Sequence, residues 1–593
     1  MKLSSSSLVS PHRLLISPFR HRRLPTLTRL TLPVTCPALS FPFPLKTLAW
    51  FRGLAAAMGE ATTASLTSMP RVHVKETIDL KEKEKMIFDR LLDVVRHFGL
   101  RTQLRVAGGW VRDKLLGKDC YDIDIAIDNM LGREFGEKVI EYLSSRGEKA
   151  RIDVIPSNPD QSKHLETAMM RLFDISIDFV NLRSEVYCEN SRIPTMTFGT
   201  AEEDAYRRDL TINSLFYNIK TNKVEDFTRR GITDLKYGKI VTPLPPKETF
   251  LDDPLRVLRA VRFGARFGFT LDEALKEAAS CDEVRAAIGD KISRERIGRE
   301  VDLMISGNQP VQAVNYMCDL KLFWVVFSLP PSVEPAVSEK CERVCAAYMS
   351  AASKLIQSIG GIKFKGEQIK LALYAALFLP FLETVYPVKK NKKVPVSDFI
   401  ILNSLKRKAN DAENVVKIHR ASMKFTALLP FITSKEDVQN ADLELVEVLI
   451  DIPRTSKLRI WIGLLLREIK DLWEVALLVC VLSYPNGIKQ ELSEEDLEMD
   501  MDKRRDLFKL VHDLIINLGL ERVWDMDPLL NGNDIMNALH LEGGPDVKDW
   551  KQNVIRWQLA HPSGTADECL EWVKDAGAKA KHAGANAKRA KLE

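Results

Sequence analysis

The sequence predicts an α+β protein in which a small mixed β-sheet with flanking helices comes first and an all-helical part follows. Between positions 103 and 182, short stretches alternate apolar and polar residues, which is the pattern of half-buried strands. Beyond position 305, the apolar residues recur at helical spacing only. The 593 residues, of which 45% are hydrophobic and 28% charged, suffice for several folded domains.

The first 57 residues are rich in Ser, Leu, Pro and Arg and contain no acidic residue before Glu60. This composition predicts an organelle transit peptide at 1–57, and a disordered basic arm is the alternative. Met58 follows the segment directly. We therefore expect the full-length form in the mitochondrion and/or plastid, and a Met58-initiated form in the cytoplasm and nucleus. The segment carries eight Lys or Arg, so the rest of the chain has a net charge of −3, and any nucleic-acid surface must be a local patch.

Apolar residues at helical spacing predict a helix from Lys81 to Phe98, and a strand from Gln103 to Ala107 follows it. Gly108 and Gly109 then stand at the mouth of a short helix that ends at Gly117. Adjacent glycines let the backbone come close to a ligand, and a helix N-terminus favours phosphate. This turn is therefore a candidate phosphate cradle.

Asp122 and Asp124 alternate with isoleucines on the next predicted strand, so both carboxylates point to one face. Two carboxylates on one face repel each other unless a cation lies between them, and one or two Mg²⁺ ions are the usual solution. A lone D-x-D is usually a solvated strand edge. Here the D-x-D motif follows the glycine pair, and Arg112 and Asp113 lie between the two motifs. This combination is typical of a nucleotidyl-transferring enzyme.

A helix is predicted from Phe135 to Arg146 and an extended segment from Arg151 to Ile155. A further alternating strand, Ile175 to Leu182, carries Asp178. A third carboxylate on a neighbouring strand would complete the metal site and could help to deprotonate an attacking hydroxyl. An ordinary surface aspartate on a strand is the alternative interpretation.

Two further segments of the first part carry candidate features. Asn158 to Ala168 carries His164, which could touch a substrate, although an isolated histidine is more often structural. Ser184 to Tyr206 is predicted to be a loop, long enough to move over a site.

Arg207, Arg208 and Asp209 are predicted to lie at the start of a helix. Two arginines suit a triphosphate, and a carboxylate beside them suits a ribose hydroxyl. A second helix is predicted over Leu251 to Phe263, where Asp253 and Arg256 would be neighbours on one face. A simple ion pair is the plainer interpretation of those two.

Together these motifs resemble the tRNA nucleotidyltransferase and bacterial-type poly(A) polymerase family, within the DNA polymerase β superfamily. The resemblance rests on the glycine pair with D-x-D, on R-R-D-x-T-I-N at 207–213, and on D-x-x-R at 253–256. Asp226 to Lys239 resembles a hinge motif with Asp234 and Gly238, and Ser293 to Glu300 resembles a further motif. Asp252 stands where the family usually has Glu. By motif, the resemblance covers about Arg101 to Glu300.

The resemblance implies a polymerase β-like nucleotidyltransferase head at 80–220 and a helical neck with a base-reading motif at 221–330. A helical body and tail that bind tRNA would occupy 331–574, and 575–593 would be a disordered basic tail. The implied activity is addition of C, C and A to the 3′ end of tRNA from CTP and ATP, without a nucleic-acid template. The implied catalytic residues are Asp122, Asp124 and Asp178, and the first two would hold Mg²⁺. The implied nucleotide-binding residues are Gly108, Gly109, Arg112, Asp113, Arg207, Arg208, Asp209, Asn213, Asp253, Arg256 and Arg259.

Other functions remain open. A poly(A) polymerase of the same family would carry nearly identical head motifs, although the Asn158 segment and the transit peptide favour tRNA. A catalytically inactive RNA-binding protein could use the same fold. A small-molecule nucleotidyltransferase fits poorly with the long helical extension. The sequence predicts no particular oligomeric state.

The remaining features are consistent with a folded protein in a reducing compartment. Nine cysteines are scattered without C-x-x-C pairs, and Cys341 and Cys345 lie four apart on a predicted helix without nearby His or Cys partners for zinc. The apolar runs Leu371 to Phe381 and Val475 to Leu482 are too short or too interrupted to span a bilayer and predict buried helices. Basic clusters near 389–408 and 503–505 could bind RNA phosphates. Ala587 to Glu593 resembles a short nuclear import signal.

Overall fold

A computed structural model gives the fold of residues 72–155, 167–188, 191–338, 340–388, 392–433, 453–485, 487 and 500–589. These residues belong to one unit, Met69–Glu593. The predicted transit peptide at 1–57 lies outside the described residues, as do His164 and positions 158–166. Thr167 and Ala168, the last part of the Asn158 segment, begin a strand.

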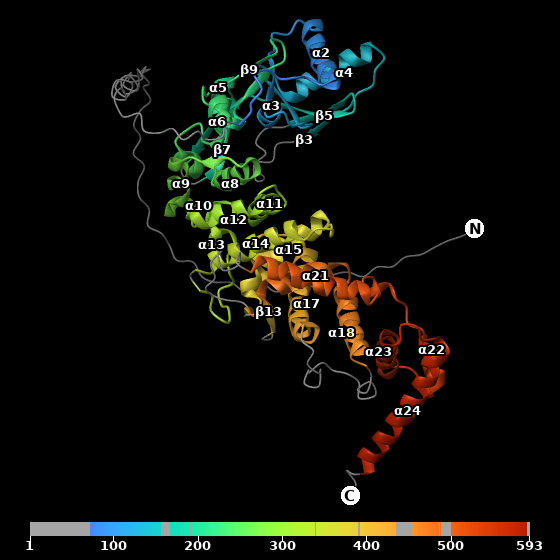
Figure 1. The fold of residues 1–593 in the computed structure, drawn as a ribbon. Coiled ribbons are helices and arrows are strands. Elements are labelled where there is room, and N and C mark those ends of the chain that lie inside the picture. Colours follow the sequence, from blue (N-terminus) through green and yellow to red (C-terminus); the bar gives the residue numbers. More distant parts are fainter. Residues whose placement is uncertain are drawn as a thin grey trace, which may run out of the picture. The chain divides into compact units, whose positions relative to one another are not determined.

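A seven-stranded mixed sheet forms the centre of the head, drawn from blue to green in Figure 1. Its strand order is β3-β4-β5-β2-β1-β8-β9; β2 and β5 pair in parallel, and all other neighbours are antiparallel. The strands predicted near 103, 123, 151 and 175 are all present. The strands are β1 (Leu104–Ala107), β2 (Ile123–Ile127), β3 (Ile152–Ile155), β4 (Thr167–Leu172), β5 (Ile175–Asn181), β8 (Phe216–Asn218) and β9 (Lys223–Glu225).

Helices pack against this sheet and bury the apolar half of its strands. Ile123, Ile125 and Phe179 are fully or almost fully buried, as the alternating pattern predicts. α4 contacts β3, β4 and β5, and α3 contacts β1. The helices of the head are α2 (Glu82–His97), α3 (Gly109–Leu115), α4 (Gly132–Ser145), α5 (Ala201–Tyr206) and the 3₁₀ turn η2 (Thr211–Asn213).

The segment Ser184 to Tyr206 is not the loop that the sequence predicts. It forms most of a hairpin, β6 (Arg183–Cys188) with β7 (Ser191–Phe198), followed by α5. Thr200 and Glu203 form a reciprocal capping box: the Thr200 side chain accepts from the Glu203 N–H, and the Glu203 carboxylate accepts from the Thr200 N–H at 2.7 Å. The start of α5 is therefore specified by the local sequence, although the polar residues around it led to the prediction of a loop.

The neck that follows is helical, and its central helix α8 contacts both α11 and α12. A short parallel pair, β10 (Lys239–Ile240) with β11 (Thr270–Leu271), is its only sheet among the described residues. Its helices are α6 (Gly231–Tyr237), α7 (Pro246–Asp252), α8 (Leu255–Phe267), α9 (Glu273–Ser280), α10 (Asp282–Lys291), α11 (Arg294–Ile305), α12 (Pro310–Asp319) and α13 (Phe323–Val326).

The body is mostly helical, as predicted, and the apolar runs at 371–381 and 475–482 are buried in it. A small hairpin, β12 (Val385–Pro387) with β13 (Lys393–Pro395), corrects the expectation of helices only. The helical elements are α14 (Cys341–Ser358), α15 (Gly366–Leu377), η3 (Leu379–Phe381), α16 (Val396–Phe399), η5 (Ile400–Ser404), α17 (Ala409–Thr433), α18 (Arg454–Ile469), η7 (Lys470–Leu472), α19 (Trp473–Ser483), α21 (Met501–Asn517) and η8 (Val523–Asp525).

The tail helices α22 (Gly532–Leu539), α23 (Pro545–Ala560) and α24 (Ala566–Arg589) share a separate small core around Trp557 and Val573. α24 runs through Arg589, so the prediction that the chain is disordered from 575 is wrong up to that residue. The stretch is rich in alanine, which has the highest intrinsic helix propensity. In the part of the chain that the structure describes, no helix is long and apolar enough to cross a membrane.

Candidate active site

Three carboxylates meet on one face of the head sheet. Asp122 precedes β2 and is exposed, while Asp124 on β2 is half-buried. Asp178 on β5 is the direct parallel partner of Asp124 in the strand register. Parallel partners in register present their side chains to the same face, so the third carboxylate stands beside the other two as the sequence predicts.

The electrostatics of this face favour a bound cation. Burial, the charge of Asp122 and the charge of Asp178 raise the pKa of Asp124 to about 6, although Arg208 acts in the opposite direction. Burial and Asp122 also raise the pKa of Asp178. Among the described residues, no group of three or more His, Cys, Asp or Glu side chains is close enough to hold a metal by itself. Two carboxylates suffice for Mg²⁺, which takes its other ligands from water and substrate phosphates, so the donor set fits this ion.

The glycine turn touches the R-R-D motif directly. Gly108 has φ +69°, and a Cβ atom at this position would lie 2.7 Å from the Arg208 guanidinium and 3.2 Å from the Asn213 carbonyl oxygen. Only glycine therefore allows Arg208 to approach the start of α3 this closely. The Gly108 N–H donates to the Leu215 carbonyl at 2.8 Å, which fixes the turn against η2.

Arg207, Arg208 and Asp209 lie at the end of α5 and not at a helix start, which corrects the prediction. Burial of the Asp204 carboxylate would raise its pKa, but Arg208 and Arg207 outweigh burial and lower it. The Asp204 carboxylate accepts hydrogen bonds from Arg208 Nη2 and from Arg207 Nε, each at 2.8 Å. Asp204 was not among the predicted site residues, although its position three and four residues before the two arginines was a usable signal.

Asp209 is held in the buried interior of the site. Burial would raise its pKa, but Arg259, at 2.7 Å, and a hydrogen bond from Asn213, at 3.0 Å, lower it to about 2. The carboxylate is therefore charged throughout the physiological range. Arg259 comes from α8, so this pair joins the head to the neck.

Arg112 and Asp113 are buried instead of lining an open cradle. Arg112 donates to Asp113 and to the Asn213 side chain, and its guanidinium lies 4.8 Å from the Phe267 ring centroid. Asp113 also accepts from Arg266 of α8 at 3.3 Å. These two predicted nucleotide-binding residues thus brace α3 against η2 and the neck.

The D-x-x-R pair does not lie on one helix as predicted. Asp253 stands in extended conformation between α7 and α8, because Pro254 disfavours helical backbone at the preceding residue. Its carboxylate accepts from the Leu255 N–H at 3.2 Å and from Arg296 of α11 at 3.4 Å. Arg256 donates to the Arg207 carbonyl at 2.7 Å and lies 3.8 Å from Glu185.

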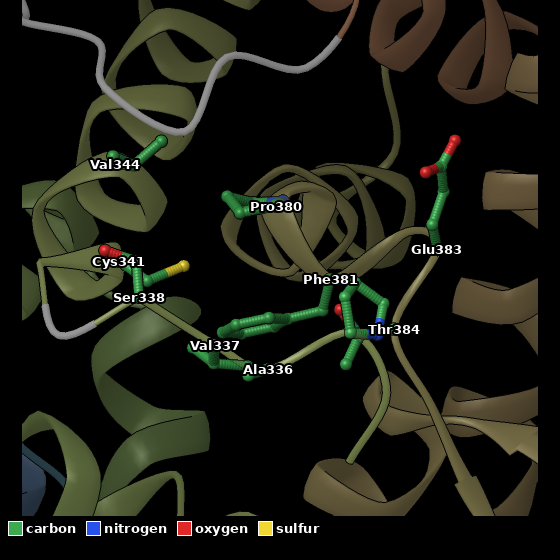
Figure 2. A pocket seen from close by; sticks show the side chains of 10 residues that line it. Ala336, Val337, Ser338, Cys341, Val344, Pro380, Phe381, Glu383 and Thr384 are labelled. Atoms are coloured by element: carbon green, nitrogen blue, oxygen red, sulfur yellow. The ribbon is translucent and has the colours of Figure 1, made fainter.

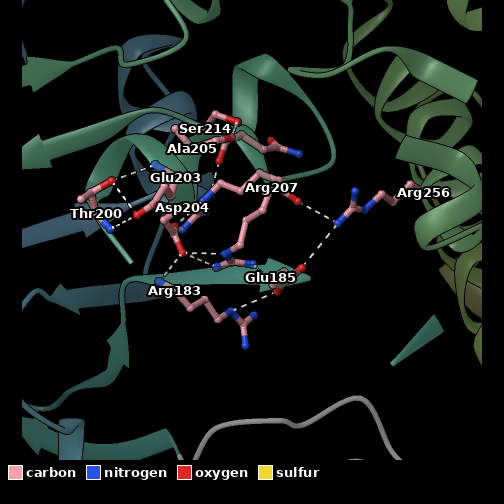
Figure 3. A network of polar contacts seen from close by, with 11 residues as sticks. Arg183, Glu185, Thr200, Glu203, Asp204, Ala205, Arg207, Ser214 and Arg256 are labelled. Atoms are coloured by element: carbon pink, nitrogen blue, oxygen red, sulfur yellow. Dashed lines mark hydrogen bonds and ion pairs between the residues drawn. The ribbon is translucent and has the colours of Figure 1, made fainter. Parts of the chain in front are cut away.

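Glu185 is a site residue that the sequence analysis missed. Its buried carboxylate on β6 lies 2.9 Å from Arg207, 3.4 Å from Arg183 and 3.8 Å from Arg256 (Figure 3). It therefore links the R-R-D motif to the D-x-x-R motif through the hairpin. No local pattern indicated it, because its partners are 22 and 71 positions further along the chain.

The head combines a mixed sheet that has three carboxylates on one face with a glycine turn that lies against paired arginines, and helices follow it in the chain. These features define a nucleotidyltransferase of the polymerase β type. Residues 104–241 match the family described as the poly A polymerase head domain. A tRNA nucleotidyltransferase of Schizosaccharomyces pombe is 33% identical, and the match covers 80% of this chain and 92% of the relative. A mitochondrial CCA tRNA nucleotidyltransferase of Candida glabrata is 34% identical over 87% of this chain and 98% of its own length.

The chain belongs to the CCA tRNA nucleotidyltransferase family. The fold agrees with this: the crystal structure of the Bacillus stearothermophilus CCA-adding enzyme in complex with CTP matches with a TM-score of 0.55 at 18% identity. That match covers 85% of this chain and all of the other.

Proposed function

We propose that this protein adds C, C and A to the 3′ end of tRNA from CTP and ATP, without a nucleic-acid template and releasing pyrophosphate, at the site described above. The observation that carries the proposal is the register of Asp124 with Asp178, on strands next to β1, which leads into the glycine turn. Relatives that span most of the chain are tRNA nucleotidyltransferases, which favours tRNA over a poly(A) tail as the product.

Each side chain has a role that its surroundings support. Asp122 and Asp124 would hold Mg²⁺. When bound, the metal would neutralise charge on the triphosphate and lower the pKa of the terminal 3′-hydroxyl. Asp178, whose pKa is raised by burial and by Asp122, accepts the proton of that hydroxyl.

The nucleotide is held by groups from the head. The backbone N–H of Gly109 and the guanidinium groups of Arg207 and Arg208 bind the triphosphate. Gly108, whose own N–H donates to the Leu215 carbonyl, gives the turn its shape. Asp209, charged and fixed by Arg259 and Asn213, accepts hydrogen bonds from the ribose hydroxyls. Arg112 and Asp113 act indirectly, because they orient Asn213 and hold α8 in place.

Asp253 and Arg256 read the base. C and A each present an exocyclic amine donor beside a ring-nitrogen acceptor, whereas G and U present the reverse order. A carboxylate beside a guanidinium complements only the first pattern. The two side chains are held by different partners, Arg296 for Asp253 and the Arg207 carbonyl for Arg256, and a bound base would share or replace these contacts.

The decisive experiment supplies purified protein with tRNA that lacks its CCA end. With CTP alone the tRNA should gain two C residues, and with CTP plus ATP it should gain C, C and A and then stop. A poly(A) polymerase would instead extend with ATP alone into a long tail. No incorporation under any condition, with tRNA binding retained, would indicate an inactive RNA-binding protein.

A further inference from the structure

The body of the protein contains a pocket between the loop before α14 and the end of η3 (Figure 2). None of the residues that line it is Lys or Arg, and Glu383 is the only one of them with a charged side chain. A nucleotide or an RNA phosphate needs cationic groups, so this pocket suits neither substrate. Charged groups gather instead in the head, around Glu185.

Four arginines and two carboxylates form one cluster where the β6–β7 hairpin meets the end of α5 and the start of α8 (Figure 3). The two carboxylates are those of Glu185 and Asp204, whose side chains are 4% and 1% exposed. Asp204 holds the two arginines of the R-R-D motif. Glu185 shares Arg207 with it and also reaches Arg256 of the D-x-x-R motif, so Glu185 spans both motifs. The arginines of this cluster are Arg183, Arg207, Arg208 and Arg256.

The two oxygens of the Glu185 carboxylate face different partners. Oε1 accepts a hydrogen bond from Arg207 Nη1 at 2.9 Å and lies 3.4 Å from Arg183 Nε. Oε2 lies 3.8 Å from Arg256 Nη2, and this same amino group donates to the Arg207 carbonyl at 2.7 Å. A guanidinium is planar, so contacts at one amino group limit the orientation of the whole group. Glu185 and the Arg207 carbonyl therefore orient Arg256 together.

Glu185 is itself held in place by the hairpin. It lies on β6 opposite Met196 of β7 in the antiparallel register. The Arg183 N–H, two residues before it, donates to the Asp204 carboxylate at 3.2 Å and ties the start of β6 to α5. A side chain on a paired strand holds its partner more accurately than one on a loop. The buried carboxylate is therefore a fixed reference point for Arg256.

We propose that Glu185 is a positioning residue for base selection, which holds the Arg256 guanidinium in the orientation that reads C and A. This role rests on the proposed function of Arg256 as a base reader, and Glu185 acts through Arg256 without touching the base itself. At 3.8 Å the contact is an ion pair beyond hydrogen-bond distance, so the charge of Glu185 is the property that matters. An uncharged residue of the same size would weaken the restraint on Arg256 and allow G and U to be accepted more often.

Glu185→Gln tests this role, because glutamine has the size of glutamate, keeps an oxygen acceptor and lacks the charge. The full-length variant and the wild type are given tRNA that lacks its CCA end, and kcat/KM is measured for CTP and for UTP separately. The preference for C over U should fall by about three- to thirtyfold, within the range found for coupled residue pairs. CTP and UTP carry the same triphosphate, so a change at Arg207 cancels in this ratio. A slower variant with the wild-type ratio would overturn the proposal and make Glu185 a structural residue.

Glu225→Gln is the matched control. Glu225 on β9 belongs to the head sheet, and its carboxylate binds Arg105 of β1 at 2.6 Å. The substitution makes the same chemical change in an ion pair of the head that is not part of the Glu185 cluster. It should leave the preference for C over U unchanged. If this variant lost as much preference as Glu185→Gln, general loosening of the head would be the cause, and the role of Glu185 would be refuted.

The double variant with Glu185→Gln and Arg256→Ala tests whether Glu185 acts through Arg256. Once the Arg256 guanidinium is gone, Glu185→Gln should change the ratio no further. An additional fall in the ratio would mean that Glu185 acts by another route. Where turnover is too slow to measure, competition between CTP and UTP for binding to the protein gives the same comparison without catalysis.

The single variant Arg256→Ala separates this role of Glu185 from the proposed function. If Arg256→Ala lowered the preference for C over U and Glu185→Gln did not, only the role of Glu185 would be wrong. If Arg256→Ala kept the wild-type preference, Arg256 would not read the base, and the role of Glu185 would fall with it.

Discussion

At the scale of single residues, the active site places like charges together, and Arg208 compensates the repulsion at Asp124 only in part. The pKa of Asp124 is about 6, whereas an unfolded chain gives about 3.8. Because the pKa of Asp124 is higher in the folded state, protonation of Asp124 stabilises the folded protein. This stabilisation is fully present below about pH 4 and is lost as the pH rises through 6. Two pKa units correspond to about 3 kcal/mol. A cation bound by the carboxylates would relieve the repulsion between them, which protonation of Asp124 relieves when no metal is bound.

This gives a prediction for Asp124→Asn. Without metal at pH 8, the variant should be more stable than the wild type by up to about 3 kcal/mol, because it lacks the buried charge. The difference should disappear near pH 4. Urea unfolding in EDTA at both pH values measures it, and exposed Asp89→Asn on α2 is the control. Added Mg²⁺ should stabilise the wild type and not the variant. If Mg²⁺ stabilised the wild type and the variant equally, Asp124 would not be a metal ligand.

A second residue-scale prediction concerns base selection. Asp253→Ala or Arg256→Ala should raise incorporation of U and G relative to C and A, as well as slow the reaction. Each mismatched buried polar group costs about 1–3 kcal/mol, so the intact pair supplies roughly 10²- to 10⁴-fold discrimination if the terms add. Single-nucleotide incorporation assays measure this ratio.

Arg296→Ala provides the control for the Asp253 variant, because it frees the Asp253 carboxylate without deleting it. This variant should change the rate more than the C and A preference. If Asp253→Ala and Arg256→Ala were slow but fully selective, the base template would lie elsewhere.

At the scale of secondary-structure elements, the sequence predicted the strands and helices whose apolar residues recur at a regular spacing. β2 and β5 were found from alternation, and α2 and α8 from helical spacing. The break between α7 and α8 was missed although Pro254 encodes it. Glu185 could not be found from local sequence, since two of its three arginine partners, Arg207 and Arg256, are brought to it by the fold. Strand periodicity fixes the shared face of Asp122 and Asp124, whereas the place of Asp178 beside Asp124 depends on the pairing of β2 with β5 and was indicated only by the family resemblance.

Helix packing gives an element-scale prediction. Gly298 in α11 lies against the segment after η5, and a Cβ atom there would stand 1.6 Å from the Leu405 carbonyl oxygen. Gly298→Ala must push backbone away from backbone and should destabilise the protein by roughly 2 kcal/mol or more. Gly289→Ala in α10 meets nothing within 4 Å and should be neutral or stabilising by about 0.5–1 kcal/mol.

Thermal and urea unfolding of the two glycine variants compare them directly. The contrast matters because both positions are helical glycines, so intrinsic helix propensity favours alanine at each. A neutral Gly298→Ala variant would mean that α11 does not pack against Leu405 as closely as described.

At the scale of the whole molecule, one continuous apolar core extends from the head through the neck into the body, and the tail helices α22 to α24 carry a second core. The extent of these cores could not be predicted from sequence, because helical periodicity reveals a buried face without identifying what covers it. The boundaries proposed for head, neck and body therefore remain predictions. Arg259 with Asp209, Arg266 with Asp113 and Arg256 with Glu185 are ion pairs that connect the neck to the head.

The last prediction concerns where the protein goes in the cell. Residues 1–57 contain eight basic and no acidic side chains, and Met58 follows them. A mitochondrial import machinery selects for such cationic, acid-free segments, and one relative of this chain is a mitochondrial enzyme. The full-length protein fused to a fluorescent reporter should therefore enter mitochondria and/or plastids, whereas a fusion that begins at Met58 should stay in the cytosol and nucleus. Replacing Arg20, Arg22 and Arg23 by Glu in the full-length fusion should abolish import without touching the described fold, which begins at Val72. Identical cytosolic distributions of the two fusions would contradict the targeting role of the segment.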